Sequence, residues 1–186
     1  MNIGFTGHRN LYGYDFDNKQ YRELTRVIRD TVLLILSKED KDTEHNTITG
    51  GALGMDTKSF YAVEDIKLTT TYKINNAVAV PFKKQYIKWP KKSQDTYFDM
   101  LKKADEVIFV DTIEKYKTGE NIHVGEYSGK KMFNRNKFIS DMSDVLIACA
   151  SDMKSGTGHC IRYFKQVHPN NPVYLINPNT YEVKIM

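Results

Sequence analysis

The chain of 186 residues, with 40% hydrophobic residues and a net charge of +4, has the length of one domain and enough apolar side chains to bury a core. Its two cysteines, Cys149 and Cys160, lie in apolar runs, which indicates buried thiols in a reducing compartment rather than a disulfide. The five histidines show no metal-ligand spacing, and the longest apolar runs are too short to span a bilayer. We therefore expect one cytoplasmic domain over residues 1–186, with no metal, cofactor or membrane partner.

The first predicted element is a strand over residues 2–7, followed by a loop that contains Gly7, His8 and Arg9. In an open α/β sheet, binding loops lie at the carboxyl ends of such strands. Arg9 could hold a phosphate through two hydrogen bonds and His8 could donate or stack, or both could be ordinary polar loop residues. Apolar residues at helical spacing then predict a helix over residues 19–37.

A second turn follows a charged loop at residues 38–46 and a β-branched strand at residues 47–49. Glycines at such a turn permit positive φ and close approach of a ligand, and the first helical turn leaves N–H groups free for an anion. Asp56 could accept a ribose hydroxyl or simply favour the helix dipole. The turn is either a phosphate cradle or an ordinary connection into a helix, and it consists of Gly50, Gly51, Ala52, Gly54, Met55 and Asp56.

Residues 76–82 form an apolar run that ends with Pro81 and Phe82, as expected of a parallel strand buried on both faces. The aromatic residues just beyond it, including Trp89, could stack on a base or pack in a core or an oligomer interface. Five lysines between residues 83 and 92 predict a solvated face, with a nucleic-acid patch as the alternative.

The next predicted elements are a helix over residues 97–104 and a buried strand over residues 106–111. Asp111 closes this strand, either as a site carboxylate or as a cap for the following segment. Residues 112–131 are polar and lack a clear period, so we interpret them as a surface excursion over the site.

A helix over residues 132–142 carries Arg135 and Asn136, and a strand over residues 144–150 follows. A third glycine turn then runs directly into a helical pattern at residues 160–167. Its free amides, two hydroxyls and the helix dipole predict another anion site, formed by Ser155, Gly156, Thr157 and Gly158.

A last strand over residues 173–176 precedes a short tail. Strands and helices thus alternate along the whole chain. This alternation predicts a single Rossmann-like α/β domain, with a doubly wound, mostly parallel sheet and helices on both faces.

With these turns in view, the chain resembles the YpsA-like branch of the SLOG superfamily, whose Rossmann-like members are related to DNA-processing protein A and to the Lonely-guy hydrolases. The matching segments span nearly the entire chain in order: residues 4–9, residues 49–56, Pro81-Phe82 with Gln85 and Trp89, Arg135-Asn136 before Ser143-Asp144, and residues 155–158. The resemblance implies a pocket at the carboxyl ends of the strands that binds a nucleotide or an ADP-ribose-like molecule.

One departure from the Lonely-guy motif bears on catalysis. Aligned on Gly156-Thr157, the chain has Cys160 where those hydrolases have a catalytic glutamate, and Ser155 replaces one of their paired glycines. A thiol cannot stabilise an oxocarbenium-like ribosyl centre as a carboxylate does. Another carboxylate would have to do so, and the candidates are Asp56, Asp111 and Glu126.

Three functions are therefore carried forward. The first is binding of a nucleotide or an ADP-ribose-derived, possibly cyclic, signal without turnover, in a bacterial or phage-infected bacterial cell, in host–phage conflict. The second is an enzyme that cleaves the N-glycosidic bond of a nucleotide, and the third, which we expect least, is single-strand nucleic-acid binding. We also expect a homo-oligomer, because Tyr12, Tyr14, Phe16 and the aromatics near Trp89 exceed what one small core needs.

Overall fold

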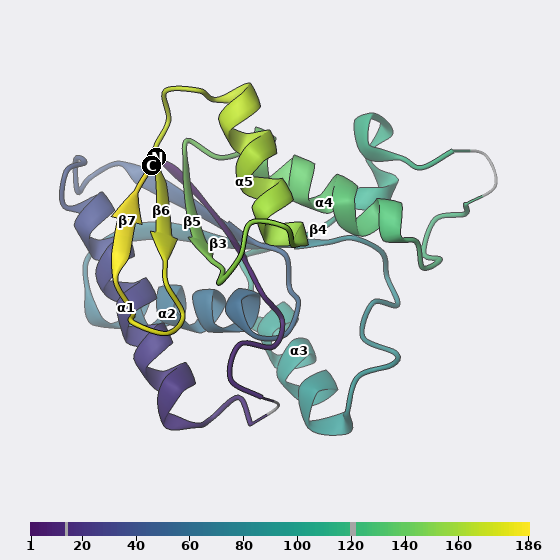
Figure 1. The fold of residues 1–186 in the computed structure, drawn as a ribbon, viewed down its shortest axis with the longest axis horizontal. Helices are drawn as coiled ribbons and strands as arrows, with labels where there is room; N and C mark the ends of the chain where they lie inside the picture. The colour runs from purple at the N-terminus through teal and green to yellow at the C-terminus, as the bar shows by residue number, and fades with distance from the viewer. Residues whose placement is uncertain (14, 120–121) are drawn as a thin grey trace.

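The computed structural model describes residues 1–13, 15–119 and 122–186, which form a seven-stranded sheet with helices on both faces (Figure 1). The strand order is β4-β3-β2-β1-β5-β6-β7, and β7 runs antiparallel to β6 while the other neighbours are parallel. The strands are β1 (Asn2–Gly7), β2 (Glu44–Thr49), β3 (Lys73–Val80), β4 (Glu106–Phe109), β5 (Val145–Cys149), β6 (Val173–Ile176) and β7 (Val183–Ile185). The predicted Rossmann-like α/β fold with a mostly parallel sheet is confirmed.

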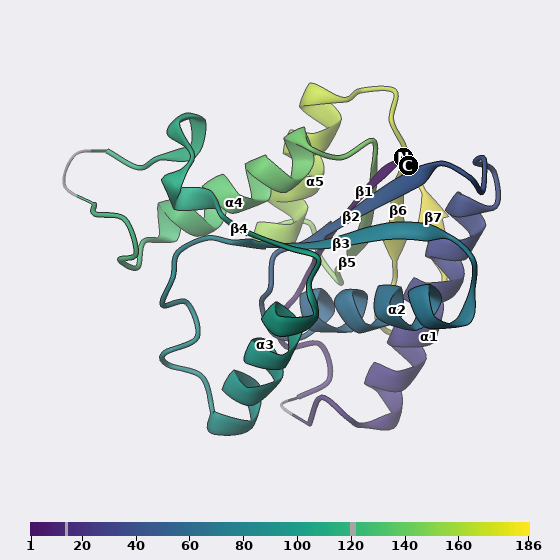
Figure 2. The same ribbon diagram turned by 180° about the vertical axis from the view of Figure 1, so that it is seen from behind.

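The helices divide into two layers. One face of the sheet carries α1 (Lys19–Leu36), α2 (Met55–Thr69) and α3 (Lys91–Lys103), and the opposite face carries α4 (Gly129–Asp141) and α5 (Gly156–Val167) (Figures 1 and 2). Two 3-10 helices, η1 (Val110–Thr112) and η2 (Glu114–Tyr116), follow β4. No helix of the described ranges is both long and apolar enough to cross a membrane.

The central strands are apolar on both sides because helices cover both faces. In β5, Ile147 and Cys149 pack in the core cluster of α1 and α2, whereas Leu146 and Ala148 pack in the cluster of α4 and α5. This alternation follows from the two-residue period of a strand. Cys149 and Cys160 are buried and pack in different clusters, which confirms the predicted burial of both thiols.

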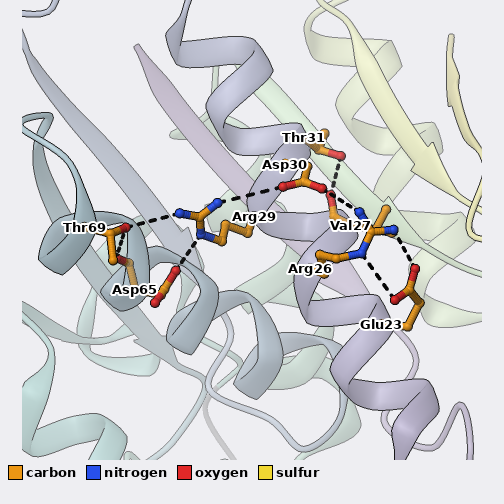
Figure 3. Close-up of polar contacts among 8 residues, drawn as sticks. All are labelled: Glu23, Arg26, Val27, Arg29, Asp30, Thr31, Asp65 and Thr69. Atoms are coloured by element: carbon orange, nitrogen blue, oxygen red, sulfur yellow. Dashed lines mark hydrogen bonds and ion pairs between the residues drawn. The ribbon is translucent and has the colours of Figure 1, made fainter.

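Polar contacts also join the first two helices across their exposed sides. Arg29 of α1 donates to the Asp65 carboxylate (2.5 Å) and to the Thr69 hydroxyl (3.2 Å) of α2 (Figure 3). On α1 itself, Arg26 pairs with Glu23 and Asp30. Such exposed pairs contribute about 0–1 kcal/mol each, so burial of the α1–α2 apolar faces carries most of the stability here.

Several predicted boundaries were wrong. The expected loop at residues 38–46 ends early because β2 begins at Glu44, and α3 begins at Lys91 rather than at residue 97. The predicted strand at residues 106–111 ends at Phe109, since Val110 and Asp111 belong to η1. In the predicted excursion, residues 129–131 already form the first turn of α4, and residues 120–121 lie outside the described ranges.

The predicted tail is also wrong, because it contains β7. This strand pairs with β6, and its three residues are all exposed. It therefore lacks the apolar run by which the central strands can be predicted. The aromatic residues near the amino terminus are used inside the chain: the rings of Tyr12 and Phe16 lie 5.0 and 5.2 Å from that of Tyr21. Tyr14 lies outside the described residues.

The strand order places a topological switch point at β1. β1 lies between β2 and β5, and the helices that follow β2 and β5 cover opposite faces. At such a point the two connections diverge and leave a crevice outside the carboxyl ends of the strands.

Candidate functional site

A pocket of about 270 Å³ lies at the carboxyl end of β1, where the switch point predicts a crevice. Four segments meet there: β1 with its following loop, the first turn of α2, one side of α4 and the first turn of α5. The lining residues are Phe5, Thr6, Gly7, His8, Arg9, Asp56, Met132, Arg135, Asn136, Ser155, Gly156 and Thr157.

Two glycines allow the β1 loop to pack directly against the start of α2. A Cβ at Gly7 would lie 2.3 Å from Cγ of Met55, and a Cβ at Gly54, which has φ +73°, would lie 2.4 Å from the Arg9 carbonyl oxygen. The Met55 N–H donates to the His8 carbonyl at 3.3 Å. One N–H group of the first turn of α2 is therefore already bonded to the protein. Gly54 and Met55 lie behind the pocket and do not line it.

A buried ion pair forms the floor of the pocket. Nη1 of Arg135 lies 3.0 Å from Oδ2 of Asp56, and both side chains are less than a tenth exposed. The same carboxylate oxygen accepts the Ala52 N–H at 3.1 Å. Gly50 makes room for the guanidinium, because a Cβ there would lie 1.1 Å from Nη1. Gly50 and Ala52 thus shape the ion pair and have no surface in the pocket.

One donor of this ion pair has no hydrogen-bond partner in the protein. The Arg135 Nε–H is buried and has no hydrogen-bond partner among the described residues. A buried donor without a partner costs about 1–3 kcal/mol of folding free energy.

Arg9 adds positive charge at the rim. Its Nη2 lies 3.8 Å from the Met132 sulfur, and loss of hydration together with the neighbouring charge of Arg135 lowers the Arg9 pKa. An arginine stays protonated despite such a shift. Two guanidinium groups therefore face a single carboxylate, Asp56, and the pocket has a surplus of one positive charge.

The amino terminus of α5 points its first turn at the same pocket. The Ser155 hydroxyl caps the helix by accepting the Gly158 N–H at 3.3 Å, and it lies 3.5 Å from Nε2 of His8. Within the described ranges, the N–H groups of Gly156 and Thr157 have no protein acceptor. Free amides and the positive end of the helix dipole both favour an anion. Gly158 itself packs against Met153, whose carbonyl oxygen a Cβ would approach to 2.1 Å.

The remaining predicted residues lie elsewhere. Gly51 has the expected positive φ of +65°, but a Cβ there would meet Val78 and Gln85 at 2.7 and 3.3 Å, away from the pocket. Phe82 is buried and its ring lies 5.7 Å from that of Tyr127, and Pro81 precedes it outside the pocket lining. These residues support the loops around the site.

Sequence reasoning missed Phe5, Thr6 and Met132, which line the pocket. Met132 shares a face of α4 with Arg135 and Asn136, since residues three and four apart lie together on a helix. That spacing could have found Met132 from the sequence. Phe5 and Thr6 could be identified only from the strand order, because the position of the switch point shows which residues of β1 face the crevice.

The alternative carboxylates are not in the pocket. Asp111 forms a buried pair with Lys131 (2.9 Å) and accepts the Gly125 N–H (2.7 Å), whereas Glu126 is exposed and accepts the His123 N–H at 3.4 Å. In the described ranges, Asp56 is the one carboxylate that lines the pocket.

Cys160 also lies outside the pocket. It is fully buried in α5 with its sulfur 3.5 Å from the Ser140 hydroxyl, and burial raises the pKa of its thiol. No cluster of metal-ligating side chains occurs in the part of the chain that the structure describes.

The strand order and the position of the pocket define a Rossmann-like protein with a pocket at its topological switch point. The chain belongs to the YspA SLOG family, whose YpsA model matches residues 3–168. The predicted SLOG resemblance is confirmed.

Relatives and solved structures agree with this assignment. An uncharacterized SPbeta prophage-derived protein, YoqJ of Bacillus subtilis (strain 168), is 34% identical over 154 residues, which cover 82% of this chain and 88% of YoqJ. DNA processing protein A from Helicobacter pylori, described as binding single-stranded DNA, aligns with TM-score 0.55, 15% identity and coverage of 98% of this chain and 68% of that one. For DNA processing protein A from Streptococcus pneumoniae the values are 0.56, 14%, 93% and 50%. At these identities the likeness to the solved structures extends to the fold alone.

Proposed function

We propose that the chain binds a phosphorylated, nucleotide-type small molecule in the pocket at β1 and holds it without turnover. The observation that carries this proposal is the convergence of the Arg135 side chain, the Arg9 side chain and the first-turn amides of α5 on one small cavity. A phosphate has acceptor oxygens for all three groups and the charge to neutralise the surplus. Membership in the SLOG family supports a nucleotide-related role.

The state of the carboxylates supports binding over cleavage. Asp56 is paired with Arg135 and accepts the Ala52 N–H, so its charge is already neutralised. Cys160 is buried away from the pocket. Cleavage of an N-glycosidic bond needs a carboxylate that can stabilise developing positive charge at the ribose. The pocket offers no uncompensated carboxylate among the described residues.

The finer form of the proposal concerns the ligand and its setting. An ADP-ribose-derived or cyclic nucleotide signal would extend from the 270 Å³ pocket past Arg9, with one phosphate on Arg135 and the first turn of α5. The prophage origin of the Bacillus subtilis relative is consistent with a role in host–phage conflict.

Calorimetry with NAD, ADP-ribose, cyclic ADP-ribose isomers and cyclic dinucleotides tests this function. We expect one site per chain for at least one of these compounds, and absence of heat with all of them would contradict the proposal. Chromatography of the same mixtures after long incubation tests turnover. A released base that disappears in Asp56→Asn or Glu126→Gln would instead establish the N-glycosidic enzyme.

A second function, single-strand nucleic-acid binding, has two observations in its favour. The five lysines between residues 83 and 92 are all exposed, and the Helicobacter pylori structural neighbour is described as binding single-stranded DNA. Two of the five, Lys91 and Lys92, are paired with Asp95 and Asp17, which reduces the free positive charge. A mobility-shift assay with an oligothymidylate at 50 and 200 mM salt decides it, because phosphate contacts make binding steeply salt-dependent.

A further inference from the structure

A second cavity, of about 620 Å³, lies on the other side of the first turn of α2. Asp56 faces the pocket at β1, whereas the next two residues, Thr57 and Lys58, line this cavity together with parts of α1, α3 and the loop before α1. Its volume is typical of sites for small organic molecules, which range from about 300 to 1,000 Å³. We call it the α2–α3 cavity.

Its walls are mainly apolar. Phe16, Leu53 and Pro90 contribute hydrocarbon surface, and the Tyr61 ring lies among them while its hydroxyl donates to Asp99 at 2.7 Å. A ligand body that fills this space therefore needs apolar surface, because contact with these walls removes it from water.

The threonine hydroxyls of the cavity are already engaged. Thr25 donates to the Tyr21 carbonyl at 2.8 Å, Thr57 to the Ala52 carbonyl at 2.8 Å and Thr96 to the Lys92 carbonyl at 3.0 Å. Each hydroxyl has one proton to donate. These side chains therefore present methyl groups and acceptor oxygens to a ligand. The other polar groups of the cavity are Ser93, its two lysines, and the Asp17 and Asp99 carboxylates, which Lys92 and the Tyr61 hydroxyl already hold.

The positive charge of Lys58 has no closely bonded carboxylate to neutralise it. Its side chain is only 15% exposed, and its ammonium lies 4.0 Å from the Asp17 carboxylate, which is held more closely by Lys92 at 2.9 Å. Within the described ranges, the Lys58 ammonium makes no hydrogen bond to the protein, and its other recorded contact is the Tyr21 ring at 5.7 Å. Burial lowers the Lys58 pKa, as expected when an ammonium loses hydration without a close partner.

We propose that the α2–α3 cavity binds a small organic acid, with its apolar body between Phe16, Leu53, Tyr61 and Pro90 and its anionic group on the Lys58 ammonium. The acid supplies the close counter-charge that Asp17 does not, and its body covers the apolar walls. This site is independent of the pocket at β1, since it uses neither Arg9, Arg135 nor α5.

The test uses 8-anilinonaphthalene-1-sulfonate, an aromatic acid whose fluorescence rises in an apolar site. We expect saturable binding of one molecule per chain. Lys58→Met should weaken it at least tenfold, because an uncompensated sulfonate would remain in the cavity. The control Lys38→Met removes an exposed lysine at the opposite end of α1 and should leave binding unchanged.

Two further variants keep the test decisive if Lys58→Met folds poorly. Thr25→Phe should fill the cavity and abolish binding, and Lys58→Arg should retain it, with thermal unfolding verifying the fold of each. Arg9→Ala should not change the dye affinity, which separates this site from the proposed nucleotide site. Dye affinity equal to wild type in both Lys58→Met and Thr25→Phe would overturn the proposal.

Competition identifies the body of the acid. Displacement of the dye by octanoate indicates an aliphatic body, and displacement by 2-naphthoate indicates an aromatic one. Either result supports the site, provided that the same acid raises the melting temperature of the wild type and not that of Thr25→Phe. An equal rise in Thr25→Phe would overturn it.

Discussion

At the scale of single residues, Arg9 contributes charge to the pocket without supporting the fold. It lies at the rim, and the one hydrogen bond recorded for its guanidinium among the described residues is to the Met132 sulfur. Arg9→Ala should therefore unfold as the wild type does, while nucleotide affinity falls by about 1.5–3 kcal/mol, the range for hydrogen bonds to charged groups. Calorimetry measures the loss, and Arg26→Ala on the exposed side of α1 is the control (Figure 3). Unchanged affinity in Arg9→Ala would remove Arg9 from the site.

Gly50 acts on the pocket through Arg135. A Cβ at residue 50 would lie 1.1 Å from Nη1 and 2.7 Å from the Asp56 carboxylate, so Gly50→Ala must push the guanidinium from its partner. Separation of a buried pair costs about 3–5 kcal/mol of folding stability. We expect a loss of that size in urea denaturation and loss of nucleotide binding as well. Gly129→Ala, at a position with no atoms near the added Cβ, should change neither.

At the scale of the secondary-structure element, the first turn of α5 separates helix stability from anion binding. Ser155 caps this turn, and aspartate is an equally good cap that also favours the helix dipole. Ser155→Asp should therefore retain or raise the melting temperature, yet its negative charge at the pocket should repel a phosphate and abolish binding. Ser155→Asn, which caps without charge, should bind more tightly than Ser155→Asp. Equal affinities of the two variants would show that α5 does not face the ligand.

At the scale of the whole molecule, the stability should depend on pH, and the buried His45 should contribute a large part of this dependence. His45 in β2 is fully buried, and neither ring nitrogen has a partner among the described residues. Burial, with the nearby amino-terminal charge, lowers the His45 pKa below its usual 6.5. The unfolded chain then binds the proton more readily than the folded one, so stability is complete above about pH 6.5 and is lost as the pH falls below it.

Urea denaturation at pH 7 and pH 5 measures this effect. We expect the wild type to lose about 1.4 kcal/mol for each unit by which the His45 pKa is lowered. His45→Leu should lose much less between the two pH values, whereas His123→Leu, at an exposed site, should behave as the wild type. An equal loss in His45→Leu would mean that other groups titrate.

The predicted homo-oligomer now rests on different residues. Tyr12 and Phe16 pack within the chain, but Leu34 of α1 and Ile185 of β7 are 51% and 57% exposed and line the same shallow groove. Exposed apolar residues beside an unpaired edge strand favour association of a second copy. Light scattering should give a multiple of 21.5 kDa. A mass equal to the monomer would contradict the prediction, and Leu34→Lys should lower the mass.

The sequence by itself determined the fold class and predicted most of the residues that line the pocket at β1. Apolar runs such as residues 76–80 have no polar alternation, and only a parallel sheet covered on both faces buries such strands. The motifs that resemble the SLOG superfamily include His8, Arg9, Arg135 and residues 155–157, all of which line the pocket. Local spacing is sufficient for these predictions because it sets which residues follow each strand.

Only the tertiary structure decided what each of these residues does. In the sequence, the turn with Gly50 and Gly54 could be a phosphate cradle or an ordinary connection, and in the structure the two glycines make room for Arg135 and for the Arg9 carbonyl. Asp56 could accept a ribose hydroxyl or favour the helix dipole, and in the structure a side chain 79 residues away pairs with it. Nothing in the local sequence predicted that β7 pairs with β6. Nor did the local sequence show that the nearest carboxylate to the Lys58 ammonium is 4.0 Å away. Close approach and charge pairing between distant segments depend on how the helices pack across the sheet. The periodicity of one segment does not determine how far its side chains lie from those of another segment.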